Sequence, residues 1–229
     1  FKGEAMNAMS RREEAVYLTK TTGVLPAMKL KDGRDLLPYA QALYDGGIRV
    51  MEVTMTTPGV LDAFRAIKHA FGDTLHLASG TTLTPAAAYA AIQAGVSIIV
   101  SPALELEVVK VAHTYGVAVY PGAFTANEVL AAMQAGAQVV KIFPAGLAGP
   151  RYMANLRMVY PELNLVPSGG LSLETAGEYI RYGACAVSGA RNFVDVEQIA
   201  AHGTGWITEQ ARQYLQIVAE AKASAYPLP

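Results

Sequence analysis

The sequence predicts a (β/α)8 barrel with one additional helix at its N-terminus. Apolar, strand-like segments alternate with helical segments along the chain, and a glycine ends most of the helical segments. These glycines recur roughly every 20 to 25 residues, the length of one compact strand–loop–helix–loop unit. Eight such units give parallel strands that close naturally into a barrel. An open doubly wound sheet would place Gly-x-Gly-x-x-Gly after the first strand, where this chain has none.

The elements follow in a regular order. A surface helix is expected over residues 4–19, ended by Thr21-Thr22-Gly23, and the helix after the first strand over 35–43. The expected strands cover residues 24–28, 48–53, 74–78, 96–100, 117–120, 137–143, 164–166 and 184–188. A last helical region is expected over 196–223, interrupted at Gly203-Thr204-Gly205. We therefore expect a single domain in which residues 1–22 form a helical extension, 23–190 carry the barrel strands and 191–229 form a C-terminal helical region.

Composition excludes several classes of function. Hydrophobic residues make up 52% of the 229-residue chain, and the formal net charge is −1, so no global field favours nucleic acid or an anionic membrane. No apolar run reaches the length of a membrane span. A lone Cys185 cannot form an internal disulfide and suits a reducing cytoplasm. The histidines (His69, His76, His113 and His202) fall on different elements without ligand spacing, so we expect no metal site.

The sixth expected strand contains the most informative residue. From Val139 onward it is apolar except for Lys141 near its C-terminal end, and strand alternation places Lys141 on one face with Val139 and Phe143. A charge does not fit between sheet and helices, so Lys141 should face the barrel axis. Glu52 is the one carboxylate inside any expected strand, and it should face Lys141 across the barrel. The pair is either a structural ion pair or a nucleophilic amine beside a proton shuttle, and because buried ion pairs stabilise poorly we favour the second.

The ends of the seventh and eighth strands predict an anion site. Ser168-Gly169-Gly170 and Gly189-Ala190 are glycine-rich turns that lead into helices. In such barrels, backbone N–H groups at these two turns commonly bind phosphate. Ordinary turn chemistry is the alternative, because turns are rich in serine and glycine anyway.

Short motifs at the strand ends, taken together, resemble one known family. In order, they are Met51-Glu52-Val53-Thr54-Met55-Thr56, Ser79-Gly80-Thr81, Ile99-Val100-Ser101-Pro102, Tyr120-Pro121-Gly122, Val140-Lys141-Ile142-Phe143-Pro144-Ala145 and Val166-Pro167-Ser168-Gly169-Gly170. The chain is similar, from about Val24 to Ala190, to the 2-keto-3-deoxy-6-phosphogluconate (KDPG) aldolase and 4-hydroxy-2-oxoglutarate (KHG) aldolase family.

The resemblance implies a class I aldolase that forms a Schiff base, needs no metal or other cofactor and assembles as a homotrimer. By match, Lys141 is the Schiff-base lysine and Glu52 the general acid and base. The positions expected to contact the keto acid are Thr56, Thr81, Pro102, Phe143 and Lys29. Those expected to bind phosphate are Ser168, Gly169, Gly170, Gly189 and Ala190. The implied products are pyruvate and an aldehyde such as glyceraldehyde 3-phosphate or glyoxylate.

Three positions depart from the family pattern. Thr56 stands where some members have an arginine, and Ala190 stands where a serine is usual. Gly146 stands where many members have a glutamate directly after Phe-Pro-Ala. The loss of a hydroxyl at position 190 leaves two substrates open, a phosphorylated 2-keto-3-deoxy sugar acid or a non-phosphorylated 2-keto acid. Two other classes also stay open: a non-lyase barrel such as an isomerase, and a catalytically silent assembly subunit.

Overall fold

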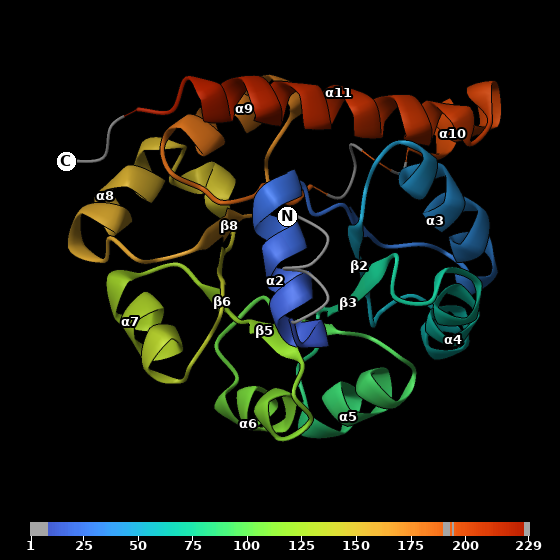
Figure 1. The fold of residues 1–229 in the computed structure, drawn as a ribbon, viewed down its shortest axis with the longest axis horizontal. Helices are drawn as coiled ribbons and strands as arrows, with labels where there is room; N and C mark the ends of the chain where they lie inside the picture. The colour runs from blue at the N-terminus through green and yellow to red at the C-terminus, as the bar shows by residue number, and fades with distance from the viewer. Residues whose placement is uncertain (1–8, 190–192, 194, 227–229) are drawn as a thin grey trace.

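The computed structural model describes residues 9–189, 193 and 195–226, and it folds as a parallel β-barrel inside a ring of helices (Figure 1). The strands are β1 Ala27–Met28, β2 Val50–Thr54, β3 His76–Gly80, β4 Ile98–Val100, β5 Ala118–Tyr120, β6 Gly122–Ala123, β7 Val140–Ile142 and β8 Leu165–Pro167. One sheet runs in the order β1 to β5 and another in the order β6 to β8, with every pairing parallel.

Two features join these sheets into a closed barrel. First, β5 and β6 are parts of one barrel strand, divided at Pro121, which has no N–H to donate to a ladder. Second, the segment before Gly189 lies between β8 and the first strand, through parallel bridges Val24–Val187 and Ser168–Ser188. The strand predicted over 184–188 is thus present as two isolated bridges. The third strand begins and ends two residues later than predicted.

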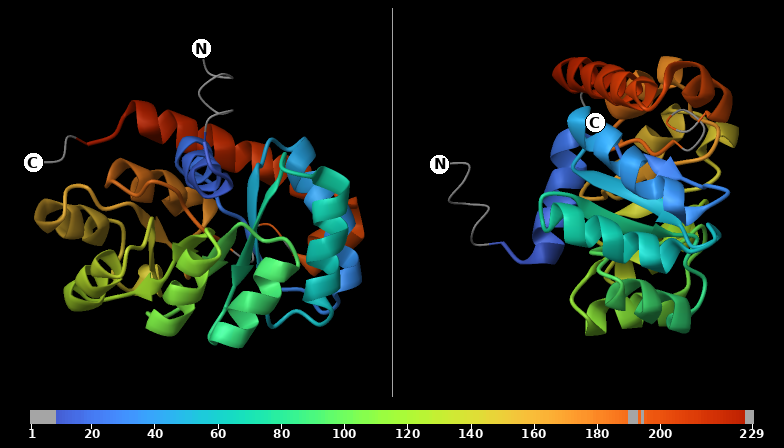
Figure 2. Two further views of the ribbon diagram at one scale, coloured as in Figure 1. Left: turned by 60° about the horizontal axis from the view of Figure 1, so that its bottom comes forward. Right: turned by 90° about the vertical axis from the view of Figure 1, so that its right-hand side faces the viewer.

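The helices are α2 Arg11–Thr22, α3 Leu36–Asp45, α4 Val60–Phe71, α5 Pro85–Gln93, α6 Leu106–Thr114, α7 Ala126–Gln134, α8 Arg151–Val159, α9 Leu173–Arg181, α10 Val196–His202 and α11 Gly205–Ala223, with 3-10 turns η1 Gly33–Asp35 and η2 Ala145–Leu147. From α3 to α9 the helices follow the strands in sequence and lie outside them in space (Figure 2). The predicted interruption of the C-terminal helical region is confirmed, because α10 ends at Gly203, whose φ is +69°.

Strand alternation sorts the buried side chains into two clusters. One cluster, inside the barrel, contains Val50 and Val139, and the other, between strands and helices, contains Met51, Val140 and Ile142. Neighbouring residues of a strand therefore belong to different clusters, as the period of two requires. This alternation confirms that the Lys141 side of its strand faces the barrel axis.

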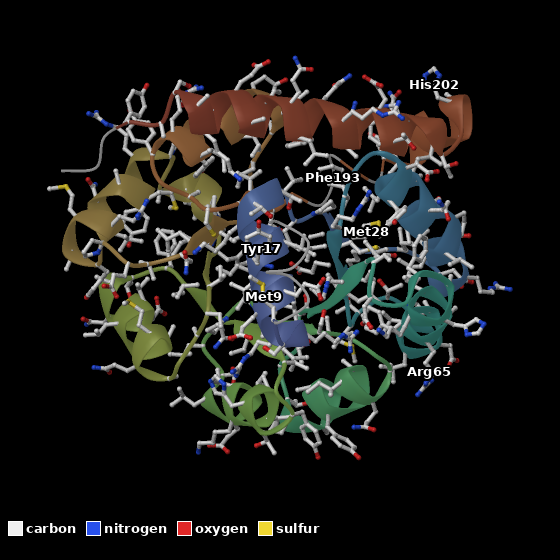
Figure 3. The ribbon with its side chains drawn as sticks, viewed as in Figure 1. Met9, Tyr17, Met28, Arg65, Phe193 and His202 are labelled. Atoms are coloured by element: carbon white, nitrogen blue, oxygen red, sulfur yellow. The ribbon has the colours of Figure 1, made fainter. Side chains whose placement is uncertain are left out.

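Helix α2 crosses the N-terminal end of the barrel (Figures 1 and 2). Ser10 and Glu13 form a capping box at its start, and Gly23 ends it with φ +73°. The helix therefore runs through Thr22, beyond the end predicted at residue 19, and the last residue of the predicted break Thr21-Thr22-Gly23 is the one that ends it. The part predicted over residues 4–8 lies outside the described residues. Ala15 packs into the inner cluster. Tyr17 lies on α2 in Figure 3, and Met9 lies just before the start of that helix.

The longest described helix, α11, is amphipathic. Its 19 residues bury one face against the rest of the molecule through Ile207, Ala211, Tyr214, Val218 and Ala221. Within residues 9–189, 193 and 195–226, no helix combines the length and apolar character that crossing a membrane requires.

Candidate active site

A cavity of about 390 Å³ opens at the C-terminal ends of the barrel strands. Its lining residues are Ala27, Glu52, Thr54, Thr81, Pro102, Lys141, Phe143, Ser168, Gly169, Gly170, Leu171 and Gly189. The cavity thus gathers side chains from strands far apart in the sequence, at the end of the barrel where enzymes of this fold place their active sites.

Lys141 and Glu52 meet in the floor of this cavity. The Lys141 Nζ lies 3.2 Å from Glu52 Oε1 and 3.4 Å from Oε2, although 89 residues separate the two along the chain. Their side chains are 9% and 2% exposed. A buried ammonium and carboxylate must compensate each other, because each alone would be strongly destabilising. The predicted encounter of the two residues is therefore present, and it places an amine and a proton acceptor within hydrogen-bond distance.

The turn after β3 is held in a strained conformation beside this pair. Thr81 has φ +55°, a left-handed conformation that branched residues rarely adopt. One hydroxyl contact and one backbone hydrogen bond fix the residues around it: Ser79 Oγ lies 2.7 Å from Thr82 Oγ1, and the Thr82 N–H donates to Val100 O at 3.1 Å. Strained residues that are held by their surroundings concentrate at functional sites. The Thr81 side chain accordingly lines the cavity.

The turn after β8 forms the opposite wall. Gly169 and Gly170 both have φ +82°, and a β-carbon on Gly169 would come within 2.8 Å of the Phe143 ring. The Ala145 N–H donates to Ser168 O and the Gly146 N–H to Gly169 O, both at 2.8 Å, so η2 holds the turn in place. The turn leads into the N-terminus of α9, where backbone N–H groups and the helix dipole favour an anion.

Some predicted site residues lie outside the cavity lining. Thr56 is exposed, and its hydroxyl lies 2.9 Å from that of Thr54, which does line the cavity. Lys29 is exposed as well, and Ala27 lines the cavity from the first strand instead. Ala190 lies outside the described residues. Strand alternation from Glu52 was the signal that could have identified Thr54.

Leu171 also lines the cavity and was not predicted. It follows two glycines in a turn, and no periodic pattern in the sequence fixes where such a residue points. Other predicted site residues do line the cavity, as expected: Ser168, Gly169, Gly170, Gly189, Pro102 and Phe143.

Strongly perturbed titratable groups lie instead toward the N-terminal end of the barrel. Burial lowers the pKa of His76 to about 4, with the charge of Arg11 adding to the effect. Burial also raises the pKa of Tyr120, whose hydroxyl lies 3.0 Å from Thr19 Oγ1 of α2. Neither side chain lines the cavity. In the described part of the chain, no group of three or more His, Cys, Asp and Glu residues could hold a metal ion.

Comparison with known proteins gives a consistent result. A family model described as KDPG and KHG aldolase matches residues 16–210. A 2-dehydro-3-deoxy-phosphogluconate aldolase of Treponema pallidum is 37% identical over 196 residues, which are 85% of this chain and 93% of that protein. A 2-dehydro-3-deoxy-6-phosphogalactonate aldolase of Escherichia coli K12 is 35% identical over 156 residues, 68% of this chain and 76% of that protein.

A solved structure shows the same architecture. The KDPG aldolase of Legionella pneumophila, with pyruvate captured at low pH as a covalent carbinolamine intermediate, matches with a TM-score of 0.79 at 28% identity. The match covers 86% of this chain and 96% of that one. The barrel predicted from the sequence is thereby confirmed.

Proposed function

This chain belongs to the KDPG and KHG aldolase family, and we propose that Lys141 and Glu52 carry its reaction. The enzyme is a class I aldolase that cleaves a 2-keto-3-deoxy sugar acid, or a 4-hydroxy-2-keto acid, into pyruvate and an aldehyde. The observation that supports these two residues most strongly is their buried contact of 3.2 Å in the floor of the cavity. The pyruvate carbinolamine trapped in the Legionella relative supports amine chemistry at such a site.

The proposed reaction begins when the free amine of Lys141 attacks the C2 carbonyl carbon of the substrate. The proton that Lys141 has given to Glu52 is passed to the carbonyl oxygen, which leaves as water, and the resulting iminium can accept an electron pair. Glu52 takes the proton of the C4 hydroxyl, directly or through a water, while the C3–C4 bond breaks and its electrons move to the iminium. The aldehyde departs, the enamine is protonated at C3, and hydrolysis of the iminium releases pyruvate and regenerates Lys141.

The cavity walls suit the remaining parts of the substrate. Pro102 and Phe143 give apolar surface beside the three-carbon unit that becomes pyruvate, and Thr81 offers a hydroxyl for its carboxylate. The predicted contribution of Thr56 would be indirect, through its contact with Thr54. Lys29 would contribute only if a substrate reached beyond the cavity lining.

We assign the far phosphate to the turn after β8 and to Gly189. Ser168 is 7% exposed and lines the cavity together with Gly169 and Gly170. Both relatives named above are called aldolases of phosphorylated sugar acids. A non-phosphorylated substrate stays the second candidate, because the described cavity lining offers no cation besides Lys141 to pair with a phosphate. Ala190, which was also expected to bind phosphate, lies outside the described residues.

Borohydride reduction in the presence of pyruvate tests the lysine. We expect one pyruvate to be reduced onto Lys141, located by peptide mass spectrometry, and we expect Lys141→Ala to abolish both adduct and cleavage. Lys110→Ala, which removes an exposed lysine, is the matched control and should retain both. An adduct that survives Lys141→Ala would overturn the assignment, and absence of any adduct would favour the non-lyase alternative.

Substrate preference needs a separate comparison. We expect kcat/KM to be higher for a 2-keto-3-deoxy-6-phosphosugar acid than for the same acid without phosphate. Ser168→Ala should reduce the value for the phosphorylated substrate alone. Equal values for the two substrates in the unaltered enzyme would instead favour the non-phosphorylated 2-keto acid.

We further propose that the enzyme is a cytoplasmic homotrimer. A cyclic trimer needs two different complementary surfaces on each copy, and two groups of exposed apolar side chains are available. One, on and beside α5 and α6, comprises Leu83, Tyr89, Leu106 and Tyr115; the other, on and beside α7 and α8, comprises Leu130, Leu147, Met158 and Val159. Light scattering should give three times the chain mass of 24.2 kDa, and a monomer mass would contradict the trimer.

A further inference from the structure

A second cavity, of about 360 Å³, lies at the other end of the barrel from the candidate active site. Its walls come from the C-terminal ends of α2, α8, α9 and α11 and from the segments that enter the last two barrel strands. The lining residues are Lys20, Arg157, Leu163, Asn164, Ile180, Arg181, Gly183, Ala184, Cys185, Lys222, Ala225 and Tyr226. We call this the basic cavity. It shares no lining residue with the candidate active site.

Charge is unbalanced in the basic cavity. Lys20, Arg157, Arg181 and Lys222 all line it, and no aspartate or glutamate does. The whole chain, by contrast, carries 18 basic and 19 acidic residues. Four cations around one small cavity repel one another unless an anion lies between them.

Backbone carbonyls at or just beyond helix ends hold two of these cations. The Lys222 Nζ donates to Lys20 O at 2.7 Å and to Thr21 O at 2.9 Å, at the C-terminal end of α2. Arg157 donates from Nη1 to Gly183 O at 3.3 Å and from Nη2 to Pro161 O at 3.0 Å. Cations commonly lie beside such carbonyls, because the last turn of a helix carries partial negative charge.

The other two cations are not held by such carbonyls. Within the described residues, the ammonium of Lys20 and the guanidinium of Arg181 make no hydrogen bond and no ion pair. The Arg157 Nε is buried and also has no partner in the described structure. A buried N–H without a partner is destabilising. The Arg157 Nε is closed off from the cavity space, so the donors available to an acceptor group there are the Lys20 ammonium and the Arg181 guanidinium.

We propose that the basic cavity binds the phosphoryl group of a small phosphorylated metabolite. Arg presents paired donors that match a phosphate, and Lys adds a compact charge. Arg181 and Lys20 contact the phosphate oxygens in this assignment. Leu163, Ile180 and Tyr226 supply apolar surface for the organic part of the ligand. The cavity volume falls within the lower range of small-molecule sites.

The test is a calorimetric titration of the full chain with glycerol 3-phosphate at constant ionic strength, with glycerol as the uncharged counterpart. The cavity variant Lys20→Gln/Arg181→Gln is compared with the control Arg65→Gln/Lys110→Gln. The control removes one arginine and one lysine, both exposed and paired within their own helices; Arg65 lies at the periphery of the molecule in Figure 3. Any affinity of the active site for phosphate is common to all the proteins, so their difference isolates the basic cavity.

We expect the cavity variant to bind glycerol 3-phosphate at least about tenfold more weakly at this site, with the control unchanged and glycerol bound by none. The charge-conserving variant Lys20→Arg/Arg181→Lys should retain most of the binding, which separates a charge effect from a folding defect. The proposal fails if the unaltered protein and the cavity variant bind glycerol 3-phosphate equally. It also fails if the control variant loses as much affinity for glycerol 3-phosphate as the cavity variant does. Aldolase activity should be the same in all of these variants.

Discussion

Gly80 lies directly against the carboxylate of Glu52, so that a β-carbon on Gly80 would overlap Glu52 Oε1 and crowd Cδ and Cγ at 2.8 Å. The two residues belong to the neighbouring strands β2 and β3. Every other side chain at this position would push the carboxylate away from Lys141. The glycine is thus required by close approach rather than by an unusual φ, and it helps to hold the Lys141–Glu52 distance.

Gly80→Ala should therefore reduce kcat roughly 100-fold, because a displacement of about 1 Å at a reacting group can have that effect. The borohydride-trapped pyruvate adduct should form more slowly as well. Gly116→Ala is the matched control: Gly116 has φ +66° and open space around its Cα. That variant should lose about 1 kcal/mol of stability and keep its activity. Wild-type kcat in Gly80→Ala would contradict this role for the glycine.

Glu52→Gln should lower kcat by about 10²- to 10⁴-fold, the usual contribution of a positioned acid or base. The amide keeps the shape of the side chain but cannot accept and return a proton. It also leaves the Lys141 ammonium without its counter-charge, so the free energy of unfolding should fall by roughly 3 kcal/mol. Steady-state kinetics and urea unfolding measure the two effects. Glu107→Gln, at an exposed pair on α6, should change neither quantity appreciably.

Thr81→Gly should separate stability from activity. Glycine adopts the left-handed conformation at this position without strain, so the free energy of unfolding should rise by up to about 1 kcal/mol after the greater backbone entropy of the unfolded chain is subtracted. The hydroxyl that lines the cavity is lost, and kcat/KM should fall. Thr81→Ser retains the hydroxyl and should retain most of the activity. A loss of stability in Thr81→Gly would refute the strain argument.

His76→Gln should flatten the acid side of the stability profile. Because the His76 pKa is about 4 in the folded state against an ordinary value of 6.5, the unfolded chain binds a proton first as pH falls. Stability is therefore lost between these two values, by an amount on the order of 2 kcal/mol from about pH 7 to about pH 5. The groups that face the ring include Glu14, whose carboxylate lies 3.5 Å from Nε2, and Ser97, 3.1 Å from Nδ1.

Urea unfolding of both proteins across this pH range provides the measurement. We expect the free energy of unfolding of His76→Gln to increase relative to that of the unaltered protein as pH falls. An unchanged gap would mean that the histidine is protonated equally in the folded and unfolded states.

The proposed catalytic pair could be predicted because its placement depends on a local rule. Alternation along a strand fixes that Lys141 and Val139 share a face, and a charge excluded from the helix-facing side has only the barrel axis left. The glycines that end successive helices indicated the repeating unit, and eight units close into a barrel. These properties depend on residues close together in the chain, so they can be inferred from the sequence alone.

Loop residues were predicted less well. The course of a loop depends on what it packs against, and no period relates one loop position to the next. Thr56 and Lys29 were expected in the cavity by resemblance, yet both are exposed, and the loop residue Leu171 lines the cavity without having been predicted. Thr54 and Ala27 also line it, but they are strand residues.

The sequence by itself determined the barrel, the axis-facing Lys141 and its encounter with Glu52, since strand periodicity and strand order suffice for these. Only the tertiary structure decided that Gly80 makes room for the carboxylate, that α2 crosses the N-terminal end of the barrel, and that Lys20 and Arg181 line one cavity. Each of these joins segments that barrel closure brings together, and distances across a closed barrel are set by the packing of the whole chain rather than by any stretch of it.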